Sequence, residues 1–516
     1  TPQWFIAMDQ AGEETARSLR AGAIAETEER VKWIPAWGRD RMRNMLKGRP
    51  DWCVSRQRVW GVSIPVFYCA KCNAEVADST VINHVADIFE RESGDAWYTH
   101  DAKDLLPPGY TCKGCGAEEW TKESDILDVW FDSGTSSVAV LENREELRWP
   151  ADVYIEGGDQ FRGWFNSSLM IGIADHDRAP YKTVITHGWT LDAQGRAMHK
   201  SAGNAVEPDK VIKQSGAEII RLWCASSNYF DDMRASDEIL QRVMDGYRKL
   251  RNTARFALGN LDGFVPARDS VPVEEMEEID RWALAELDRV TKKVLAAYEA
   301  FEFHNVYQAL FNFATVTLSA RYFDIIKDRL YTFAPRNKAR RAAQTVLLRI
   351  ADALARMLAP ILVFTADEIW ENLPNRTEPS IHLALLPTAA EGSDETLLAE
   401  WERLFAIRDD VLRALEEARV AKLIGSSLQA KVRLEASGST LELLQRHQDD
   451  LRYLFIVSQV ELGNANEGDG VSITIAAADG EKCERCWNYS IRVGESERYP
   501  TVCERCIAAL EEIEQG

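Results

Sequence analysis

Two short stretches decide the fold of the first half of the chain: Val153-Tyr154-Ile155-Glu156-Gly157-Gly158 and Thr183-Val184-Ile185-Thr186-His187-Gly188. Each is a β-branched or alternating run that stops at glycine, as a short strand does. Strands that end in this way present backbone and polar side chains at the carboxyl edge of a parallel sheet, where open α/β folds bind ligands. We therefore predict a ligand site at this edge.

The second half of the chain reads differently. From about Asp237 to Trp370 apolar residues recur at helical spacing, and Pro335 and Pro360 mark breaks between helices. This pattern predicts a helix bundle. After it, residues 397–423 read as another helix, and residues 429–435 and 471–476 read as strands of a small α+β module.

Length and composition limit the class of protein. The 516 residues exceed what one hydrophobic core organises, so several domains are expected. With 46% hydrophobic and 28% charged residues, the composition is that of a folded globular chain. The longest apolar stretch, residues 346–370, is interrupted by charged residues, so no membrane span is expected. The net charge of −21 disfavours indiscriminate binding to nucleic acid.

Eight of the ten cysteines form Cys-x-x-Cys pairs, and the chain shows no signal sequence, so zinc is favoured over disulfides. The pairs near the carboxyl terminus have the spacing of one structural zinc site, with free or redox thiols as the alternative. The earlier pairs lie farther apart and predict a second zinc. The alternative is that these Cys-x-x-Cys turns, or knuckles, bind no metal. The two sets are Cys483, Cys486, Cys503 and Cys506, and Cys69, Cys72, Cys112 and Cys115. The remaining Cys53 and Cys224 are expected to be buried and inert.

A glycine-flanked loop, Gly195-Arg196-Ala197-Met198-His199-Lys200-Ser201-Ala202-Gly203-Asn204, carries one lysine and one serine. Such a loop suits transient contact with a polyphosphate, because an ammonium group stabilises charge that develops on leaving pyrophosphate. Taken alone, the stretch is a weak signal, and an ordinary surface loop is its default interpretation.

Four further motifs precede this loop and change its interpretation. They are Asp51-Trp52-Cys53-Val54-Ser55-Arg56-Gln57-Arg58-Val59-Trp60-Gly61, Asp128-Val129-Trp130-Phe131-Asp132-Ser133-Gly134, Glu156-Gly157-Gly158-Asp159-Gln160-Phe161-Arg162-Gly163-Trp164-Phe165 and His187-Gly188-Trp189. Together they closely resemble the bacterial isoleucyl-tRNA synthetases, a family of class I aminoacyl-tRNA synthetases. The loop is similar to the KMSKS signature of that family, although Ala197 and His199 replace its first lysine and its middle serine.

The resemblance continues along nearly the whole chain. Residues 318–331 and 358–370 look like the anticodon-binding bundle of the family, and Cys483-Glu484-Arg485-Cys486-Trp487 looks like its carboxyl-terminal zinc ribbon. No His-x-Gly-His element and no editing domain is recognisable in the sequence. We therefore expect the chain to be the carboxyl-terminal part of a larger enzyme.

The resemblance implies a multidomain α/β plus all-α fold. Residues 1–236 would form part of a Rossmann-like catalytic domain with a zinc-bearing insertion at about 62–150. A helical anticodon-binding domain would follow at 237–395, a small α+β module at 396–478 and the zinc ribbon at 479–516.

The resemblance also implies roles for single residues. Glu156, Gly157, Asp159 and Gln160 would hold the aminoacyl-adenylate, and His187 with Gly188 would face the adenine. In the loop Met198, His199, Lys200 and Ser201 would form the catalytic signature, with Lys200 as its remaining ammonium group.

The implied activity is that of an isoleucine–tRNA ligase, with ATP, L-isoleucine and tRNA(Ile) as substrates and Mg²⁺ bound to ATP. A cytoplasmic monomer is expected. Because the His-x-Gly-His element is missing, an alternative is a non-catalytic fragment or module that binds tRNA. A third interpretation, a zinc-ribbon nucleic-acid protein of other chemistry, leaves the adenylate motifs unexplained.

Overall fold

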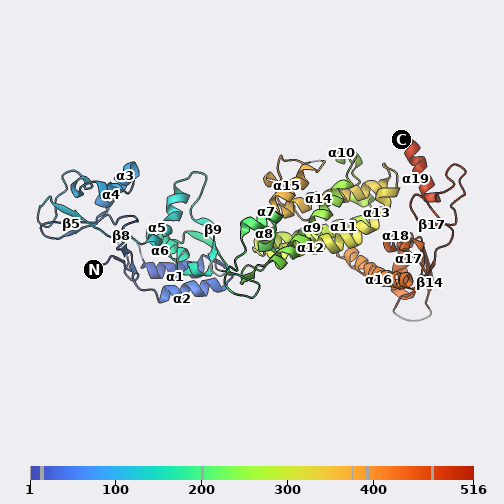
Figure 1. Cartoon of the computed structure of the whole chain (residues 1–516), viewed down its shortest axis with the longest axis horizontal. Coiled ribbons are helices and arrows are strands. Elements are labelled where there is room, and N and C mark those ends of the chain that lie inside the picture. Colours follow the sequence, from blue (N-terminus) through green and yellow to red (C-terminus); the bar gives the residue numbers. More distant parts are fainter. Residues whose placement is uncertain are drawn as a thin grey trace. The chain divides into compact units, whose positions relative to one another are not determined.

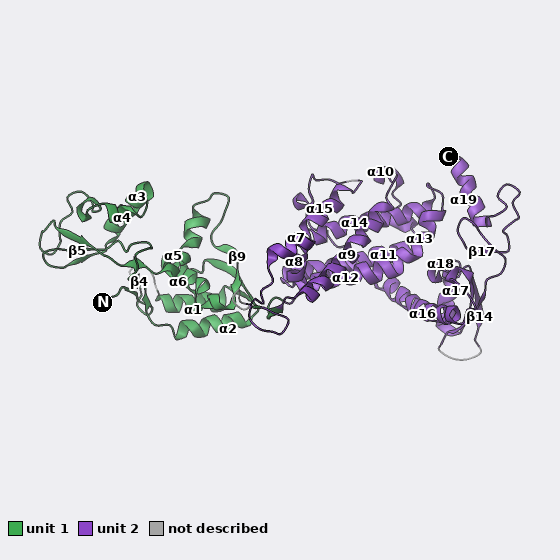
Figure 2. Ribbon diagram, viewed as in Figure 1, with its two compact units in different colours: residues 1–190, 229–233 green, residues 191–228, 234–516 purple. Residues whose placement is uncertain are grey.

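A computed structural model describes residues 2–11, 17–198, 203–374, 376–390, 394–465 and 470–515. The chain divides into two compact units: residues 1–190 with 229–233, and residues 191–228 with 234–516 (Figure 2). Across these ranges no helix is both long and apolar enough to cross a membrane. The finer division into four domains stays a prediction.

The first unit is built on a three-stranded parallel sheet with the order β2-β10-β9. Strands β9 and β10 contain the two stretches that the sequence predicted, and both end at the expected glycine or histidine. The bounds of the three strands are Lys32–Ile34 for β2, Ala151–Gly157 for β9 and Tyr181–His187 for β10.

Three helices cover one face of this sheet. One of them, α6, connects β9 to β10 (Figure 1). Trp33, Tyr154 and Val184 pack on these helices and are nearly inaccessible to solvent. This packing removes the apolar residues of that face from water, whereas Val153 and Ile155 of β9 are exposed. The helices are α1 (Leu19–Glu29), α2 (Trp37–Lys47) and α6 (Trp164–His176).

A smaller antiparallel sheet, β6-β5-β7, carries the earlier cysteine pairs. Its core gathers Phe67, Val81, Val85 and Trp97. The elements are β5 (Phe67–Cys69), β6 (Glu75–Val76), β7 (Trp120–Lys122), α3 (Ser79–Glu92) and α4 (Ala96–Thr99).

The buried carboxylate of Asp128 joins two of the sequence motifs. It accepts a hydrogen bond from Trp52 Nε1 (3.1 Å) and forms an ion pair with Arg56 (2.9 Å). It also accepts a hydrogen bond from the backbone N–H of Trp130, at the start of α5 (Val129–Gly134). A buried charge is stable only when it is paired in this way. The motifs at residues 51–61 and 128–134 therefore form one structural unit.

The second unit contains the predicted helix bundle (Figure 1). Its first long helix, α9, begins at Asp237, where the Ser236 hydroxyl accepts from the N–H of Ile239 (3.3 Å). Both predicted breaks are confirmed, because Pro335 and Pro360 lie between helices. The helices are α7 (Pro208–Ser215), α8 (Ala217–Ser226), α9 (Asp237–Gly259), α11 (Glu278–Glu299), α12 (Phe303–Asn312), the π-helical segment η6 (Phe313–Tyr322), α13 (Phe323–Thr332), α14 (Lys338–Leu358) and α15 (Val363–Glu371).

A long helix leads from the bundle into the small α+β module. This helix, α16 (Glu395–Val420), ends earlier than predicted because Lys422 adopts a left-handed backbone conformation (φ 59°), and Leu423 N–H returns to the Ala418 carbonyl. The two predicted strands are confirmed within one residue, and a third lies beside them. The module contains β13 (Ala430–Ala436), β14 (Gln459–Asn464), β15 (Ser472–Ala477), α17 (Gly438–Arg446) and α18 (Leu451–Phe455).

The prediction that both unpaired cysteines are buried is wrong. Cys53 is half-buried, and its sulfur contacts the side-chain oxygen of Gln3 at 3.4 Å. Cys224 is exposed, because the helical repeat of α8 turns Leu222, Trp223 and Ala225 inward and leaves position 224 outside.

Glu218 caps the start of α15, and its substitution tests how much this contact stabilises the bundle. Its buried carboxylate accepts from the N–H groups of Phe364 (2.9 Å) and Thr365 (3.0 Å), which are otherwise unpaired at the start of α15. We expect Glu218→Ala to lower the free energy of unfolding of the second unit by about 3 kcal/mol, because these donors lose their acceptor inside the protein. Calorimetric unfolding measures the change. The exposed Glu238→Ala is the control, and an equal effect of both variants would contradict the capping role.

Candidate active site and metal centres

The carboxyl ends of β9 and β10 lie side by side. In their parallel register Glu156 stands opposite Thr186, and Gly157 stands opposite His187. The prediction that the two glycine-ended strands meet at one sheet edge is therefore confirmed. The edge combines an exposed carboxylate, a buried glycine and a half-buried imidazole.

The turn after β9 brings the side chains of Asp159 and His187 close to Gly157, so that a side chain at Gly157 would require Asp159 to move. A Cβ there would lie 2.9 Å from Asp159 Oδ1 and 3.5 Å from the His187 ring. Gln160 donates to Asp159 (2.9 Å), and its own oxygen accepts from the N–H of Trp164 (3.0 Å), at the start of α6. Asp159 and Gln160 are thus fixed relative to the helix, while Glu156 points into solvent.

His187 is held in one tautomer. Its Nδ1 lies 2.8 Å from the carbonyl oxygen of Gly188, which can only accept, so Nδ1 carries the proton. In the neutral ring Nε2 is then left as an acceptor. Gly188 itself donates to the Tyr229 carbonyl (2.9 Å), and a Cβ at this position would lie 2.3 Å from the backbone of Asp231. Only glycine fits this close approach of two backbone segments.

Arg41 belongs to the same edge, although the sequence analysis missed it. Its guanidinium lies over the rings of Phe161 (4.9 Å) and Trp37 (5.8 Å), and one nitrogen lies 3.3 Å from where a Cβ of Gly158 would be. Between Arg17 and Arg58 the sequence contains 11 Lys and Arg residues against 5 Asp and Glu residues, but this excess of positive charge does not single out position 41.

The stem of the lysine loop is organised by Asp192, which the sequence analysis also missed. This carboxylate accepts from the side chain of Asn204 (2.9 Å) and from the backbone and side chain of Arg196 (2.9 and 2.8 Å). These hydrogen bonds, first that of Asn204, hold its pKa well below the ordinary value. Asn204 also donates to the Ala197 carbonyl (3.1 Å), so both ends of the loop are tied together.

The predicted catalytic residues of the loop are described only in part. Met198 is half-buried at the end of the stem. The predicted His199, Lys200 and Ser201 lie outside the described residues. Their roles therefore stay predictions.

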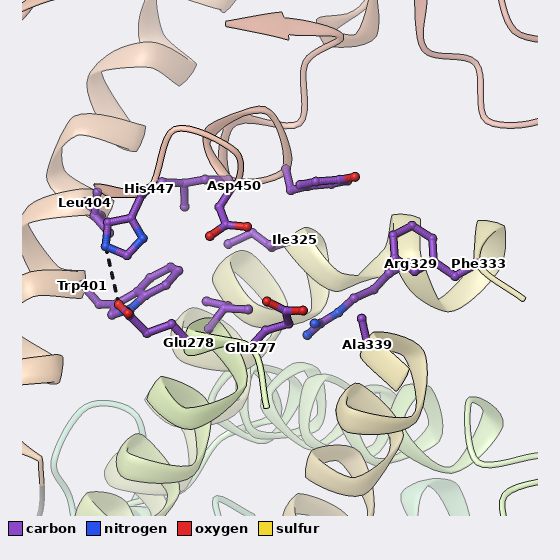
Figure 3. A pocket seen from close by; sticks show the side chains of 13 residues that line it. Glu277, Glu278, Ile325, Arg329, Phe333, Ala339, Trp401, Leu404, His447 and Asp450 are labelled. Carbon is purple, nitrogen blue, oxygen red and sulfur yellow. Dashed lines mark hydrogen bonds and ion pairs between the residues drawn. The ribbon is translucent and has the colours of Figure 1, made fainter. Parts of the chain in front are cut away.

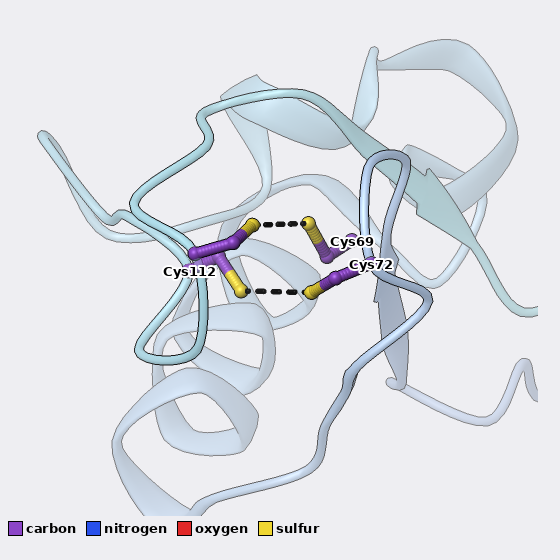
Figure 4. Close-up of side chains that lie close together, drawn as sticks. Cys69, Cys72 and Cys112 are labelled. Carbon is purple, nitrogen blue, oxygen red and sulfur yellow. Dashed lines mark hydrogen bonds between the residues drawn. The ribbon is translucent and has the colours of Figure 1, made fainter.

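The earlier cysteine pairs converge on one point (Figure 4). The sulfurs of Cys69 and Cys115 are 3.6 Å apart, as are those of Cys72 and Cys112. A tetrahedral zinc with Zn–S bonds of ~2.3 Å would place its sulfurs about 3.8 Å apart, so the four thiols fit this ion. Backbone N–H groups, first that of Cys72, lower the pKa of Cys69 to about 6, which favours the thiolate that zinc requires.

Cys483, Cys486, Cys503 and Cys506 also gather within 4.8 Å and are all buried. The sulfurs of Cys486 and Cys503 lie 3.6 Å apart. Arg485 donates to Cys506 (3.5 Å), and the N–H of Cys503 donates to Cys483 (3.3 Å), so the positive groups needed by a thiolate cluster are present. Hydrogen bonding within the cluster, first with Cys503, holds the pKa of Cys486 far below its usual value.

Three of the four knuckles share one backbone design. Residues Asn73, Gly116 and Trp487 each follow a Cys-x-x-Cys pair in a left-handed conformation and donate their N–H to the carbonyl of its first cysteine. This turn points both sulfurs of a pair to the same side. Four sulfur ligands leave no open coordination position, so both centres are suited to structure and not to catalysis.

Comparison with known proteins gives matches along the chain. Residues 1–236 match the family model described as "tRNA synthetases class I (I, L, M and V)". Residues 280–434 match "Anticodon-binding domain of tRNA ligase", and residues 480–509 match "Zinc finger found in FPG and IleRS".

Curated relatives extend over nearly all of the chain. An isoleucine–tRNA ligase of Syntrophotalea carbinolica is 51% identical and covers 99% of this chain. Those of Geobacter sulfurreducens and Moorella thermoacetica are 49% and 45% identical, each over 99% of this chain. The chain spans about half the length of these relatives, at 55%, 55% and 56%.

The two sulfur clusters predict the metal content. We expect elemental analysis to find about two zinc ions per chain, because each cluster supplies four ligands. Cys72→Ser and Cys486→Ser should each remove about one ion, whereas Cys53→Ser and Cys224→Ser, which change the unpaired cysteines, should remove none. A chain with one zinc that Cys72→Ser leaves unchanged would contradict the earlier centre.

Proposed function

The chain belongs to the class I aminoacyl-tRNA synthetases, and from this premise we propose that it takes part in the ATP-dependent charging of tRNA(Ile) with L-isoleucine. The observation that carries the proposal is the 51% identity, over 99% of the chain, to a protein named isoleucine–tRNA ligase. The geometry of the sheet edge supports it, because the carboxylate of Glu156, the backbone of Gly157 and the imidazole of His187 lie side by side there. The protein would act as a cytoplasmic monomer.

The first step joins the amino acid to the nucleotide. A carboxylate oxygen of isoleucine attacks the α-phosphorus of ATP, and the bond to the β-phosphate oxygen breaks, so that pyrophosphate leaves. In the second step a terminal ribose hydroxyl of the tRNA attacks the carbonyl carbon, and AMP leaves with the electrons of the broken bond. Neither step needs a protein nucleophile, so positioning and charge stabilisation supply the catalysis.

We assign the binding of the adenylate to the sheet edge. The Glu156 carboxylate suits the α-ammonium or a ribose hydroxyl, and Gly157 lets the ligand approach the backbone. Asp159 and Gln160, fixed by their mutual hydrogen bond, would supply further polar contacts. The Nε2 acceptor of His187, beside Gly188, would face the exocyclic amino group of adenine.

We assign charge stabilisation to the loop. Lys200 would contact the leaving pyrophosphate, with Met198, His199 and Ser201 shaping the loop around it. Mg²⁺ carried by ATP would neutralise the remaining phosphate charge. The stem that Asp192 organises would limit the positions open to Lys200.

We further propose that the second unit binds the anticodon arm of the tRNA. A pocket of ≈ 450 Å³ lies between α13, α18 and the zinc ribbon, and Tyr331 and Trp487 at its border expose 62% and 61% of their surface. Lys482 lies over the Trp487 ring (5.3 Å), and Arg452 lines the pocket. Exposed aromatic faces beside cations are suited to stacking unpaired RNA bases.

The activation step is tested by isoleucine-dependent exchange of pyrophosphate into ATP. We expect exchange with isoleucine, and a loss of about 100-fold or more in Lys200→Ala, because charge on the leaving pyrophosphate loses its partner. Lys210→Ala, which removes an exposed lysine of α7, is the matched control. Exchange with valine or leucine but not with isoleucine would contradict the assignment of isoleucine as the substrate.

A second candidate function is tRNA binding without activation. It is favoured by the match of residues 280–434 to an anticodon-binding domain, because binding of tRNA by such a domain needs no catalytic site. Binding of tRNA by the chain with no adenylate formation would select this alternative. Adenylate formation by the chain alone would eliminate it.

The RNA-binding surface is tested separately. We expect Trp487→Ala to weaken the binding of tRNA(Ile) by about tenfold, because one stacked base is worth ~1–3 kcal/mol. Fluorescence anisotropy with labelled tRNA measures the change, and Phe364→Ala, at an equally exposed aromatic residue of α15, is the control. Equal weakening in both variants would contradict a specific role of the ribbon.

A further inference from the structure

A cavity of ≈ 210 Å³ lies inside the second unit, and none of its lining residues belongs to the sheet edge or to the lysine loop (Figure 3). It is bordered by the start of α11, by α13, by α16 and by the segment of the α+β module around α18. This volume far exceeds the ~10–15 Å³ that holds one water molecule. The cavity therefore has room for a small organic molecule.

One wall of the cavity is apolar and firmly held. Trp401 and Leu404 of α16 line it, together with Ile325 of α13. Trp401 is only 3% exposed, and its Nε1 donates to Glu278 (2.9 Å), so the indole ring cannot move away. This wall suits an aliphatic or aromatic group.

The border of the cavity also carries an excess of negative charge. Glu277, Glu278 and Asp450 all line the cavity, and Glu278 is already engaged by Trp401 and by His447 (3.5 Å). Among the described residues, the carboxylates of Glu277 and Asp450 have no hydrogen-bond or ion-pair partner. Both carboxylates are exposed to solvent at the border of the cavity, and the pKa of Asp450 is raised, first by partial burial and then by the charge of Glu277. An ammonium group placed between them would relieve this repulsion.

A cation also reaches into the cavity from α13. Figure 3 shows the Arg329 side chain extending toward Glu277. Arg329 is only 8% exposed, and one of its Nη groups donates to the buried Asp280. Within the part of the chain that the structure describes, its Nε has no hydrogen-bond partner. A buried guanidinium with an unused donor is costly, and a planar carboxylate is the group that best satisfies it.

We propose that this cavity binds a small zwitterion with an apolar side chain, which is the chemistry of a free α-amino acid. Its ammonium group lies between Glu277 and Asp450, its carboxylate lies at Arg329, and its side chain packs on Trp401 and Leu404. The opposite charges at the two ends distinguish this ligand from a simple amine and from a simple acid. The site shares no residue with the proposed adenylate site, so it does not depend on the proposed function.

Calorimetric titration of the zinc-loaded chain with L-phenylalanine tests the proposal. Phenethylamine, which lacks the carboxylate, and 3-phenylpropionate, which lacks the ammonium group, are titrated in parallel. We expect L-phenylalanine to bind, and each analogue to bind at least about tenfold more weakly, because each loses one charge-assisted contact.

Variants locate the binding. Glu277→Gln and Asp450→Asn should each weaken the binding of L-phenylalanine by about tenfold, since each removes a charge that faces the ammonium group. Ala339→Phe should abolish binding by filling the cavity while every charge remains. Glu274→Gln and Asp449→Asn, which change neighbouring carboxylates outside the cavity lining, are the matched controls. Circular dichroism and zinc content establish that each variant is folded.

Three outcomes would overturn the proposal. The first is no binding of L-phenylalanine by the unaltered chain. The second is equal binding of phenethylamine, which would remove the role of Arg329. The third is binding that Ala339→Phe leaves unchanged, which would place the ligand elsewhere in the chain.

Discussion

The parallel pairing of β9 with β10 is the constraint on which the candidate active site depends. Because the two strands run in the same direction and in register, Glu156 and Gly157 come to lie beside Thr186 and His187. An antiparallel pair would place the two chain ends at opposite edges of the sheet. Gly188 allows the backbone of this edge to approach that of Asp231, where a Cβ would lie only 2.3 Å away.

The sulfur clusters supply order where no large core can form. The terminal ribbon has only short strands, β16 (Glu481–Lys482) and β17 (Tyr489–Ser490), and one helix, α19 (Glu504–Gln515). Metal binding would therefore contribute much of its folding energy. Within the second unit the ribbon is attached to α13 through ion pairs between Arg505 and Asp328 and a hydrogen bond from Arg485 to the Thr332 carbonyl. A zinc ion bound by the four cysteines would thus help to present Trp487 beside the bundle.

Local patterns in the sequence predicted much of this fold. The ends of β9 and β10, the start of α9 and the four cysteine pairs depend on neighbouring residues, so each was visible in a short window. The guanidinium of Arg41 gains its significance from stacking on Phe161, which is distant in the sequence. The partners of Asp192, Arg196 and Asn204, are near it in the sequence, but the loop conformation that brings the three together is not visible in the pattern of residue types. The same holds for the cavity at Arg329, whose walls come from segments more than a hundred residues apart. The exposure of Cys224 was missed because composition alone does not give the face of a helix.

The central claim is that the carboxyl edge of the parallel sheet receives the adenylate. Nuclear magnetic resonance of histidine-labelled protein, titrated with a stable sulfamoyl analogue of isoleucyl-adenylate, tests it most directly. The account predicts that the ring signals of His187 shift on saturation, while those of His176, at the far end of α6, stay in place. Saturable binding that leaves the His187 signals unchanged, or no binding at all, would contradict it.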